Sequence, residues 1–291
     1  MKDFFIHLIK GSLMGTANVI PGVSGGTMAM LTGIFERLIH AISSCNIHAL
    51  KMLLKGDFKS FSKQIDLIFL TSITVGIILS VFSISKVLEF LFIDFKTLIW
   101  AYFFGLIFAS ILYIGKTIKH FTFSVNLFFI FGSIIAISML FITPSTENSS
   151  TSYLIISGAV AMCSMILPGL SGSFILLIMG NYELIISSVS SLNMQVLIPF
   201  GFGAIIGLLL FAKLLSWIFK KYPDHTTALL TGFIFGSLAV LWPWKIENDL
   251  LTGYIYYLPG INIEAILSVL LIIFGIASIV IIESLSIKDD A

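Results

Sequence analysis

The stretch Pro21-Gly22-Val23-Ser24-Gly25-Gly26 recurs, with two changes, as Pro168-Gly169-Leu170-Ser171-Gly172-Ser173. Each copy interrupts a strongly apolar stretch with residues that break helices, because proline removes a backbone donor and glycine permits positive φ. In lipid, an unpaired backbone group is so costly that broken helices persist only where they are buried in protein or face water. The two copies therefore predict a membrane chain with two internal breaks.

Composition supports a membrane protein. The chain has 291 residues, of which 58% are hydrophobic and 11% charged, with a mean hydropathy of +1.08. In ordinary soluble domains about a quarter of the residues are charged. We therefore expect an all-α, polytopic protein that forms one membrane domain over residues 1–291. The chain has no long basic tract that would suit nucleic acid, its two cysteines and five histidines show no metal-ligand spacing, and no cofactor is expected.

A membrane span needs about 20 mostly apolar residues. Two apolar stretches, 5–42 and 153–190, each hold one Pro-Gly motif near the middle, and we interpret them as broken elements. The remaining predicted spans are uninterrupted, and they cover residues 65–86, 97–115, 124–142, 195–219, 226–244 and 262–283.

The two halves of the chain align with each other. A shift of 147 positions, the distance from Pro21 to Pro168, superposes the motifs. The same shift places Gly11, Gly33 and Glu36 on Gly158, Gly180 and Glu183. The segment that begins at Gly105 resembles the one that begins at Gly232. We therefore expect a first repeat over residues 1–145 and a second over 150–291, each with one broken element followed by three spans.

Lysine and arginine are enriched in cytoplasmic loops, so charge predicts the topology. If each broken element enters and leaves the membrane on one side, most basic residues share a face; if it crosses once, the bias weakens. The re-entrant arrangement is therefore favoured, with both termini cytoplasmic. Three spans per half then invert the second repeat, an arrangement typical of secondary transporters. The shared face holds Lys2, Lys10, Arg37, Lys51, Lys55, Lys59, Lys63, Lys116, Lys119, Lys220, Lys221 and Lys288, and the other face holds Lys86, Lys96 and Lys245.

The motif residues are suited to binding an anion. A serine after the break can cap the following half-helix, whose N-terminal amides favour negative charge. Two inverted hairpins bring two such ends toward one centre. The alternative interpretation is that the motifs only make tight turns and close packing. The predicted substrate-binding residues at the motifs are Ser24, Gly25, Gly26, Thr27, Ser171, Gly172 and Ser173.

Four further polar residues near the motifs are candidates for function. Arg37 is suited to hold a phosphate with two parallel hydrogen bonds. Glu36 and Glu183 are candidates for binding a coupling proton, since an ionisable residue at membrane depth is a functional hypothesis. Asn18 precedes the first motif and has no polar counterpart at Met165, so the two copies are not equivalent. The alternative for Glu36, Arg37 and Glu183 is an anchoring role at the membrane interface.

The sequence shows no catalytic motif, so we do not expect an enzyme. The observations from residues alone leave several functions open: a carrier for a lipid phosphate, a carrier for a small soluble anion, a membrane enzyme acting on lipid phosphates, or a scaffold. A coupling proton or sodium ion and assembly into a homo-oligomer also stay open.

The stretch from Gly15 to Thr27 and the stretch from Leu167 to Phe174 resemble the bacterial family of PopT-like polyprenyl-phosphate transporters. The resemblance extends over essentially the whole chain, including Gly33-Ile34-Phe35-Glu36-Arg37 and Gly180-Asn181-Tyr182-Glu183. It implies a flippase of the bacterial plasma membrane that returns undecaprenyl phosphate from the outer to the inner leaflet, so that the carrier is reused in cell-envelope synthesis. The implied partners are this lipid phosphate and the membrane lipids. The identity of the substrate comes from the resemblance alone.

Overall fold

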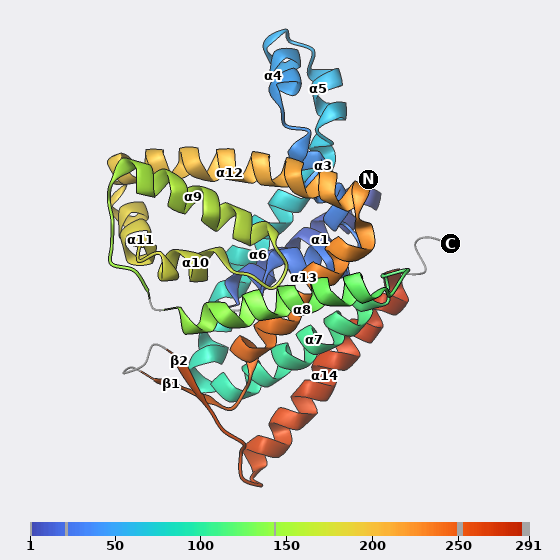
Figure 1. Cartoon of the computed structure of the whole chain (residues 1–291), viewed down its shortest axis with the longest axis vertical. Coiled ribbons are helices and arrows are strands. Elements are labelled where there is room, and N and C mark those ends of the chain that lie inside the picture. The colour runs from blue at the N-terminus through green and yellow to red at the C-terminus, as the bar shows by residue number, and fades with distance from the viewer. Residues whose placement is uncertain (1, 21–22, 143, 249–252, 287–291) are drawn as a thin grey trace.

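The fold was analysed in a computed structural model that describes residues 2–20, 23–142, 144–248 and 253–286. Among these residues, six helices are long and apolar enough to cross a membrane (Figure 1). A short 3₁₀ turn, η1 (Met139–Phe141), continues α8. The six predicted spans and the all-α polytopic class are confirmed. The six helices are α6 (Leu67–Asp94), α7 (Lys96–Gly115), α8 (Phe123–Ser138), α12 (Met194–Lys221), α13 (Pro223–Leu241) and α14 (Ile263–Ser286).

Each predicted broken element consists of three helices. The first contains α1 (Lys2–Val19), α2 (Gly25–Leu31) and α3 (Phe35–Ser43), and the second contains α9 (Thr151–Ile166), α10 (Gly172–Ile178) and α11 (Tyr182–Ser191). Pro21 and Gly22, the first two residues of the first motif, lie outside the described residues. Between α10 and α11 the chain bends by 113°. Each element therefore has a second break, which the Pro-Gly motifs did not predict.

The second break has the same structure in both halves. Gly33 and Gly180 have φ of 70° and 73°, a region that glycine enters without steric cost. The amide of Gly33 donates to the carbonyl of Met30 and that of Ile34 to Ala29, as in a Schellman motif. In the second half Gly180 donates to Leu177 and Asn181 to Leu176. These four donors and acceptors correspond one by one under the shift of 147 positions.

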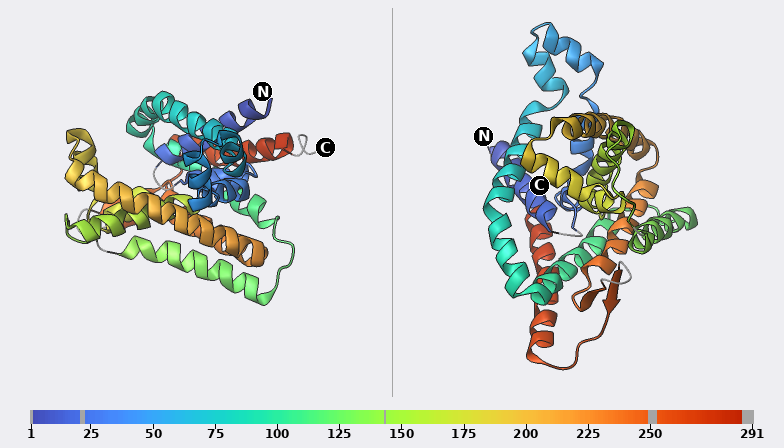
Figure 2. Two further views of the ribbon diagram at one scale, coloured as in Figure 1. Left: turned by 90° about the horizontal axis from the view of Figure 1, so that it is seen from above. Right: turned by 90° about the vertical axis from the view of Figure 1, so that its left-hand side faces the viewer.

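Long helices pack in pairs: α1 against α6, α9 against α12, α7 against α14, and α8 against α13. Glycines let the backbones approach, as small residues do in membrane helix pairs. A Cβ on Gly105 would clash with the Ile272 carbonyl, and one on Gly232 with the Phe129 carbonyl. Figure 2 shows the resulting arrangement of the helices from two further directions.

The same kind of contact joins the first helix of each broken element to the span that follows it. A Cβ on Gly11 would meet the Ile73 carbonyl, and one on Gly158 the Phe200 carbonyl. The other helix of each pair has a matching glycine. A Cβ on Gly76 would meet the Leu8 carbonyl, and one on Gly203 the Ile155 carbonyl. Gly11 and Gly158 are related by the first shift, and Gly76 and Gly203 by the shift that relates Gly105 to Gly232.

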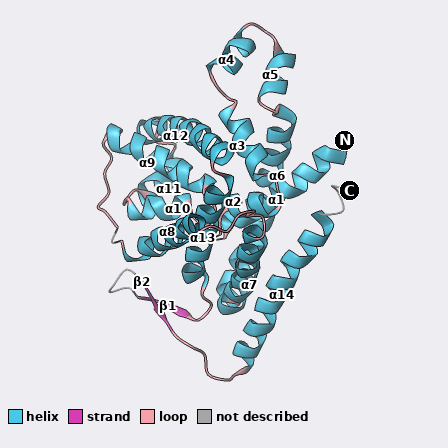
Figure 3. Ribbon diagram, turned by 45° about the vertical axis from the view of Figure 1, so that its right-hand side comes forward, coloured by secondary structure: helices cyan, strands magenta, loops and turns pink. Residues whose placement is uncertain are grey.

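Two smaller units complete the fold. Helices α4 (Ile47–Leu54) and α5 (Phe58–Gln64) project from the main body (Figure 3). The side chains of Asn46 and Asp57 accept hydrogen bonds from amides in the first turns of these helices. Strands β1 (Lys245–Asn248) and β2 (Gly253–Tyr256) form an antiparallel hairpin after α13, with Lys245 opposite Tyr256. The all-α prediction did not include this hairpin.

The ends of the helices define two sides of the molecule. Helices α1 and α8 begin on one side of the molecule, and helices α12 and α14 end on the same side (Figure 1). Lys220, at the end of α12, and the α4–α5 projection belong to this side. The end of α13 and the β-hairpin lie on the opposite side. We call these the basic side and the hairpin side. Lys288, which the topology prediction also used, lies outside the described residues.

Candidate functional site

The two motifs meet through hydrogen bonds between the halves. The Ser24 hydroxyl donates to the carbonyl of Leu167 at 3.2 Å, and the Thr27 hydroxyl accepts from the amide of Gly169 at 3.1 Å. Gly26 leaves room for this contact, because a Cβ there would lie too close to the Ile166 carbonyl and 3.2 Å from the Pro168 nitrogen. Residues 143 positions apart in the sequence are thus joined at the start of α2.

The polar groups of the first motif already have partners. The Ser24 hydroxyl accepts from the amide of Gly26 at 3.1 Å, and the Asn18 side chain accepts from the amide of Gly25 at 2.9 Å. Ser24 and Thr27 are only 3% and 1% exposed. In this conformation the first motif therefore binds the second motif and its own side chains, and Asn18 serves as an additional cap for α2.

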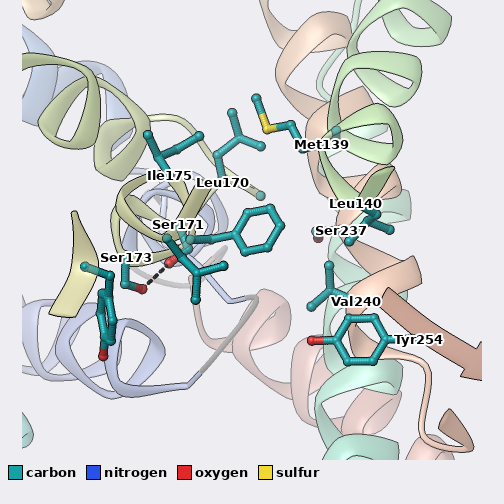
Figure 4. A pocket seen from close by; sticks show the side chains of 14 residues that line it. Met139, Leu140, Leu170, Ser171, Ser173, Ile175, Ser237, Val240 and Tyr254 are labelled. Carbon is teal, nitrogen blue, oxygen red and sulfur yellow. Dashed lines mark hydrogen bonds between the residues drawn. The ribbon is translucent and has the colours of Figure 1, made fainter. Parts of the chain in front are cut away.

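The second motif faces a cavity. Ser171 has nearly the same backbone as Ser24, with φ −113° in both. However, within the described residues its side chain does not cap α10, and its hydroxyl lies 2.8 Å from that of Ser173. Both serines line a cavity of about 280 Å³, which we call the tip cavity (Figure 4). Gly172, between them, is buried.

The other wall of the tip cavity comes from residues that the sequence analysis did not select. Ser237 and Val240 near the end of α13 and Tyr254 of β2 lie across the cavity from Ser171 and Ser173 (Figure 4). Apolar side chains, including Leu140 and Phe174, line the rest. Nothing in the sequence indicated Ser237 beyond its place in the predicted span 226–244. Tyr254 lies in the β-hairpin, which was not predicted.

Asn181 is another polar residue that the sequence did not indicate as functional. It is 0% exposed, and its side chain accepts from the amide of Asn148 at 2.9 Å and donates to the carbonyl of the same residue at 3.0 Å. Its amide group also donates to the Ser157 hydroxyl at 3.4 Å. These bonds hold the α10–α11 bend against the connection before α9, and therefore position Tyr182, which lines the tip cavity.

Arg37 lies far from the tip cavity. Its Nε is 2.7 Å from Asp66 Oδ2, its Nη1 is 3.1 Å from His7 Nε2, and its guanidinium lies over the Phe69 ring. Together with Pro223 it lines a separate cavity of about 400 Å³ on the basic side. Pro223 and Val240 stand near opposite ends of α13, about 25 Å apart at the helical rise of roughly 1.5 Å per residue. The structure therefore does not bring Arg37 to the second motif.

The two glutamates are also outside the tip cavity. Glu36 is exposed and lines the basic-side cavity beside Arg37, and Glu183 is exposed in the first turn of α11. Neither has the burial on which the proton-binding hypothesis depends. Among the described residues, no group of three or more His, Cys, Asp or Glu side chains is placed to hold a metal ion.

Six apolar spans, two broken elements that touch at their motifs, and a partly polar cavity at one of them define the class of protein: a polytopic membrane transporter with discontinuous helices. Residues 14–254 match the VCA0040-like family, described as undecaprenyl phosphate translocase-like. The chain belongs to this family, and the resemblance seen in the motifs is confirmed.

Two relatives are each called a polyprenyl-phosphate transporter. The protein from Vibrio cholerae is 38% identical over 243 residues, which cover 84% of this chain and 79% of the relative. The protein from Staphylococcus aureus is 32% identical over 267 residues, covering 85% and 90%. No solved structure matches this chain.

Proposed function

We propose that this chain is a flippase that carries a polyprenyl phosphate, undecaprenyl phosphate in particular, from the outer to the inner leaflet of the bacterial plasma membrane. The observation that carries the proposal is the tip cavity, in which the Ser171 and Ser173 hydroxyls stand among apolar side chains. The names of the relatives supply the substrate class. The lipid returned in this way re-enters cell-envelope synthesis.

The proposed cavity solves the central difficulty of moving such a lipid. A charged phosphate does not enter hydrocarbon unaided, because burying an unpaired charge is very unfavourable. Hydroxyl donors at the second motif replace water around the phosphate, while the apolar wall and surrounding lipid accommodate the polyprenyl chain. This role needs no bond to be made or broken, so we propose transport without catalysis.

We further propose that the repeats 1–145 and 150–291 are inverted relative to each other, with both termini cytoplasmic. Three observations support the repeat: apart from α4, α5 and the β-hairpin the helix order is the same in both halves, both second breaks are Schellman motifs, and the glycine contacts correspond pair by pair. The lysines near the basic side support the orientation.

The decisive experiment is flipping of undecaprenyl phosphate in proteoliposomes, with and without proton or sodium gradients. We expect protein-dependent movement from one leaflet to the other that soluble phosphate does not inhibit. Inhibition by soluble phosphate would favour a carrier for a small anion, and release of inorganic phosphate from the lipid would favour an enzyme. Absence of flipping under every gradient would reject the proposal.

A further inference from the structure

A lysine is held against the wall of the tip cavity that faces the second motif. The Lys245 ammonium donates to the carbonyl of Val240 and lies 3.7 Å from the centroid of the Trp100 ring and 4.7 Å from that of Tyr254. Val240 and Tyr254 line the cavity across from Ser171 and Ser173 (Figure 4). The aromatic faces attract the cation and keep it at this wall.

Trp100 provides an independent sign of a ligand. It is only 7% exposed, and its indole N–H has no hydrogen-bond partner among the described residues. Leaving a buried donor without an acceptor costs about 1–3 kcal/mol, so such groups are rare and usually have a reason. The N–H belongs to the ring over which the Lys245 ammonium lies, so the two donors share one small region.

The charge balance of the cavity points to the same region. None of the described residues that line the tip cavity carries a formal charge. A phosphate monoester carries about −1.5 to −2 charges near neutral pH. Hydroxyls carry no formal charge to offset such a group in surroundings of low dielectric, whereas an ammonium next to the cavity offsets one of its negative charges.

We propose that Lys245 and Trp100 form an anion-binding corner that receives the phosphate of the polyprenyl phosphate on the hairpin side, with Ser171 and Ser173 binding it from the opposite wall. This inference rests on the proposed function and adds the countercharge of the site. The corner recognises the phosphate and not the polyprenyl chain, and it therefore discriminates the phosphate from the corresponding alcohol. Tyr254 is a positioning residue, because it acts by holding Lys245.

The test compares binding of undecaprenyl phosphate and of undecaprenol to the full-length protein in nanodiscs. We expect Lys245→Gln to weaken binding of the phosphate at least tenfold and to leave binding of the alcohol unchanged. Lys245→Arg should retain most of the affinity, and Trp100→Phe, which keeps an aromatic ring but removes the N–H, should lose several-fold. Lys96→Gln, at the exposed start of α7 on the same side, is the matched control and should bind as the wild type does.

Two outcomes would overturn the corner while leaving the proposed function intact. In one, the wild type binds and flips the lipid phosphate and Lys245→Gln does so equally well. In the other, Lys245→Gln loses affinity for phosphate and alcohol alike together with a lower melting temperature, which is the signature of a structural role. If the wild type neither binds nor flips the lipid phosphate, the proposed function fails, and the corner fails with it.

Discussion

At the scale of single residues, equivalent serines in the two motifs lie in opposite surroundings. Ser24 is buried and bonded to Leu167 across the interface between the halves, whereas Ser171 stands in the tip cavity. The sequence showed that these positions correspond, but it did not show which copy faces the cavity. That difference depends on contacts between residues more than 140 positions apart, which no local pattern encodes.

The interface hydroxyls and the cavity hydroxyls should therefore respond differently to mutation. Thr27→Val leaves the Gly169 amide without its acceptor, and we expect it to lower the free energy of unfolding by about 1–3 kcal/mol. Ser171→Ala should change the free energy of unfolding by less than about 0.5 kcal/mol, which is usual for substitutions at the surface. The same variant should bind the lipid phosphate more weakly. Unfolding and binding measured on both variants in detergent decide the matter; equal losses of stability would contradict the assignment.

Arg37 is placed to act on folding through Asp66. Both side chains are well exposed, so the pair should contribute only about 0.2–1 kcal/mol. We expect a double-mutant cycle of Arg37→Gln and Asp66→Asn to show a coupling of that size in thermal unfolding. If Arg37 acts only through this pair, flipping by the double variant Arg37→Gln/Asp66→Asn should be no lower than flipping by Asp66→Asn alone. A further loss in the double mutant would instead support the predicted contact of Arg37 with phosphate.

At the scale of elements, close packing of helix backbones is concentrated at particular glycines. In α12, a Cβ on Gly203 would clash with the Ile155 carbonyl of α9, whereas one on Gly201 would meet nothing within 4 Å. Gly203→Ala should lower stability by about 1–3 kcal/mol, the usual effect of overpacking. Gly201→Ala, two residues away in the same helix, should be neutral or slightly stabilising, because alanine is the better helix former.

Gly76→Ala extends this test to the first repeat. Gly76 occupies the matching place in α6, where a Cβ would clash with the Leu8 carbonyl of α1. If the two halves pack by the same rule, Gly76→Ala should lower stability by an amount in the same range of about 1–3 kcal/mol as Gly203→Ala. Thermal unfolding of the three purified variants provides the measurement. A large difference between Gly76→Ala and Gly203→Ala would contradict the repeat.

The elements also show which signals in the sequence were sufficient. Long apolar runs predicted all six spans, since length and hydropathy are local properties. The second break at Gly180 and the strand around Tyr254 were missed, because a glycine before a polar turn and a four-residue strand are weak signals. The missing strand is the reason that the part of the cavity wall formed by Tyr254 was not predicted.

At the scale of the whole molecule, matched positions are closed on the basic side and open on the hairpin side. Phe35 is 4% exposed, and the centroid of its ring lies 5.8 Å from that of Phe219 in α12. Tyr182, the matching residue 147 positions later, is 37% exposed and lines the tip cavity. Gly26 is packed closely against the second motif, whereas Ser173, the residue 147 positions later, is exposed and lines the cavity. A transporter built from inverted repeats should exchange these two environments as it changes the side of access.

Equivalent cysteines report this asymmetry directly. Ser171→Cys and Ser24→Cys, each in a background without Cys45 and Cys163, carry the same substitution at matched positions. A membrane-impermeant maleimide added outside intact cells should label the cysteine at 171, because Ser171 lines a cavity whose wall includes Val240 and Tyr254 on the hairpin side. It should label the cysteine at 24 at least tenfold more slowly, because Ser24 is buried. Saturating undecaprenyl phosphate should slow labelling at 171. Fast labelling at 171 only in inside-out vesicles would reverse the proposed orientation, and equal rates at the two positions would contradict the seal between the motifs.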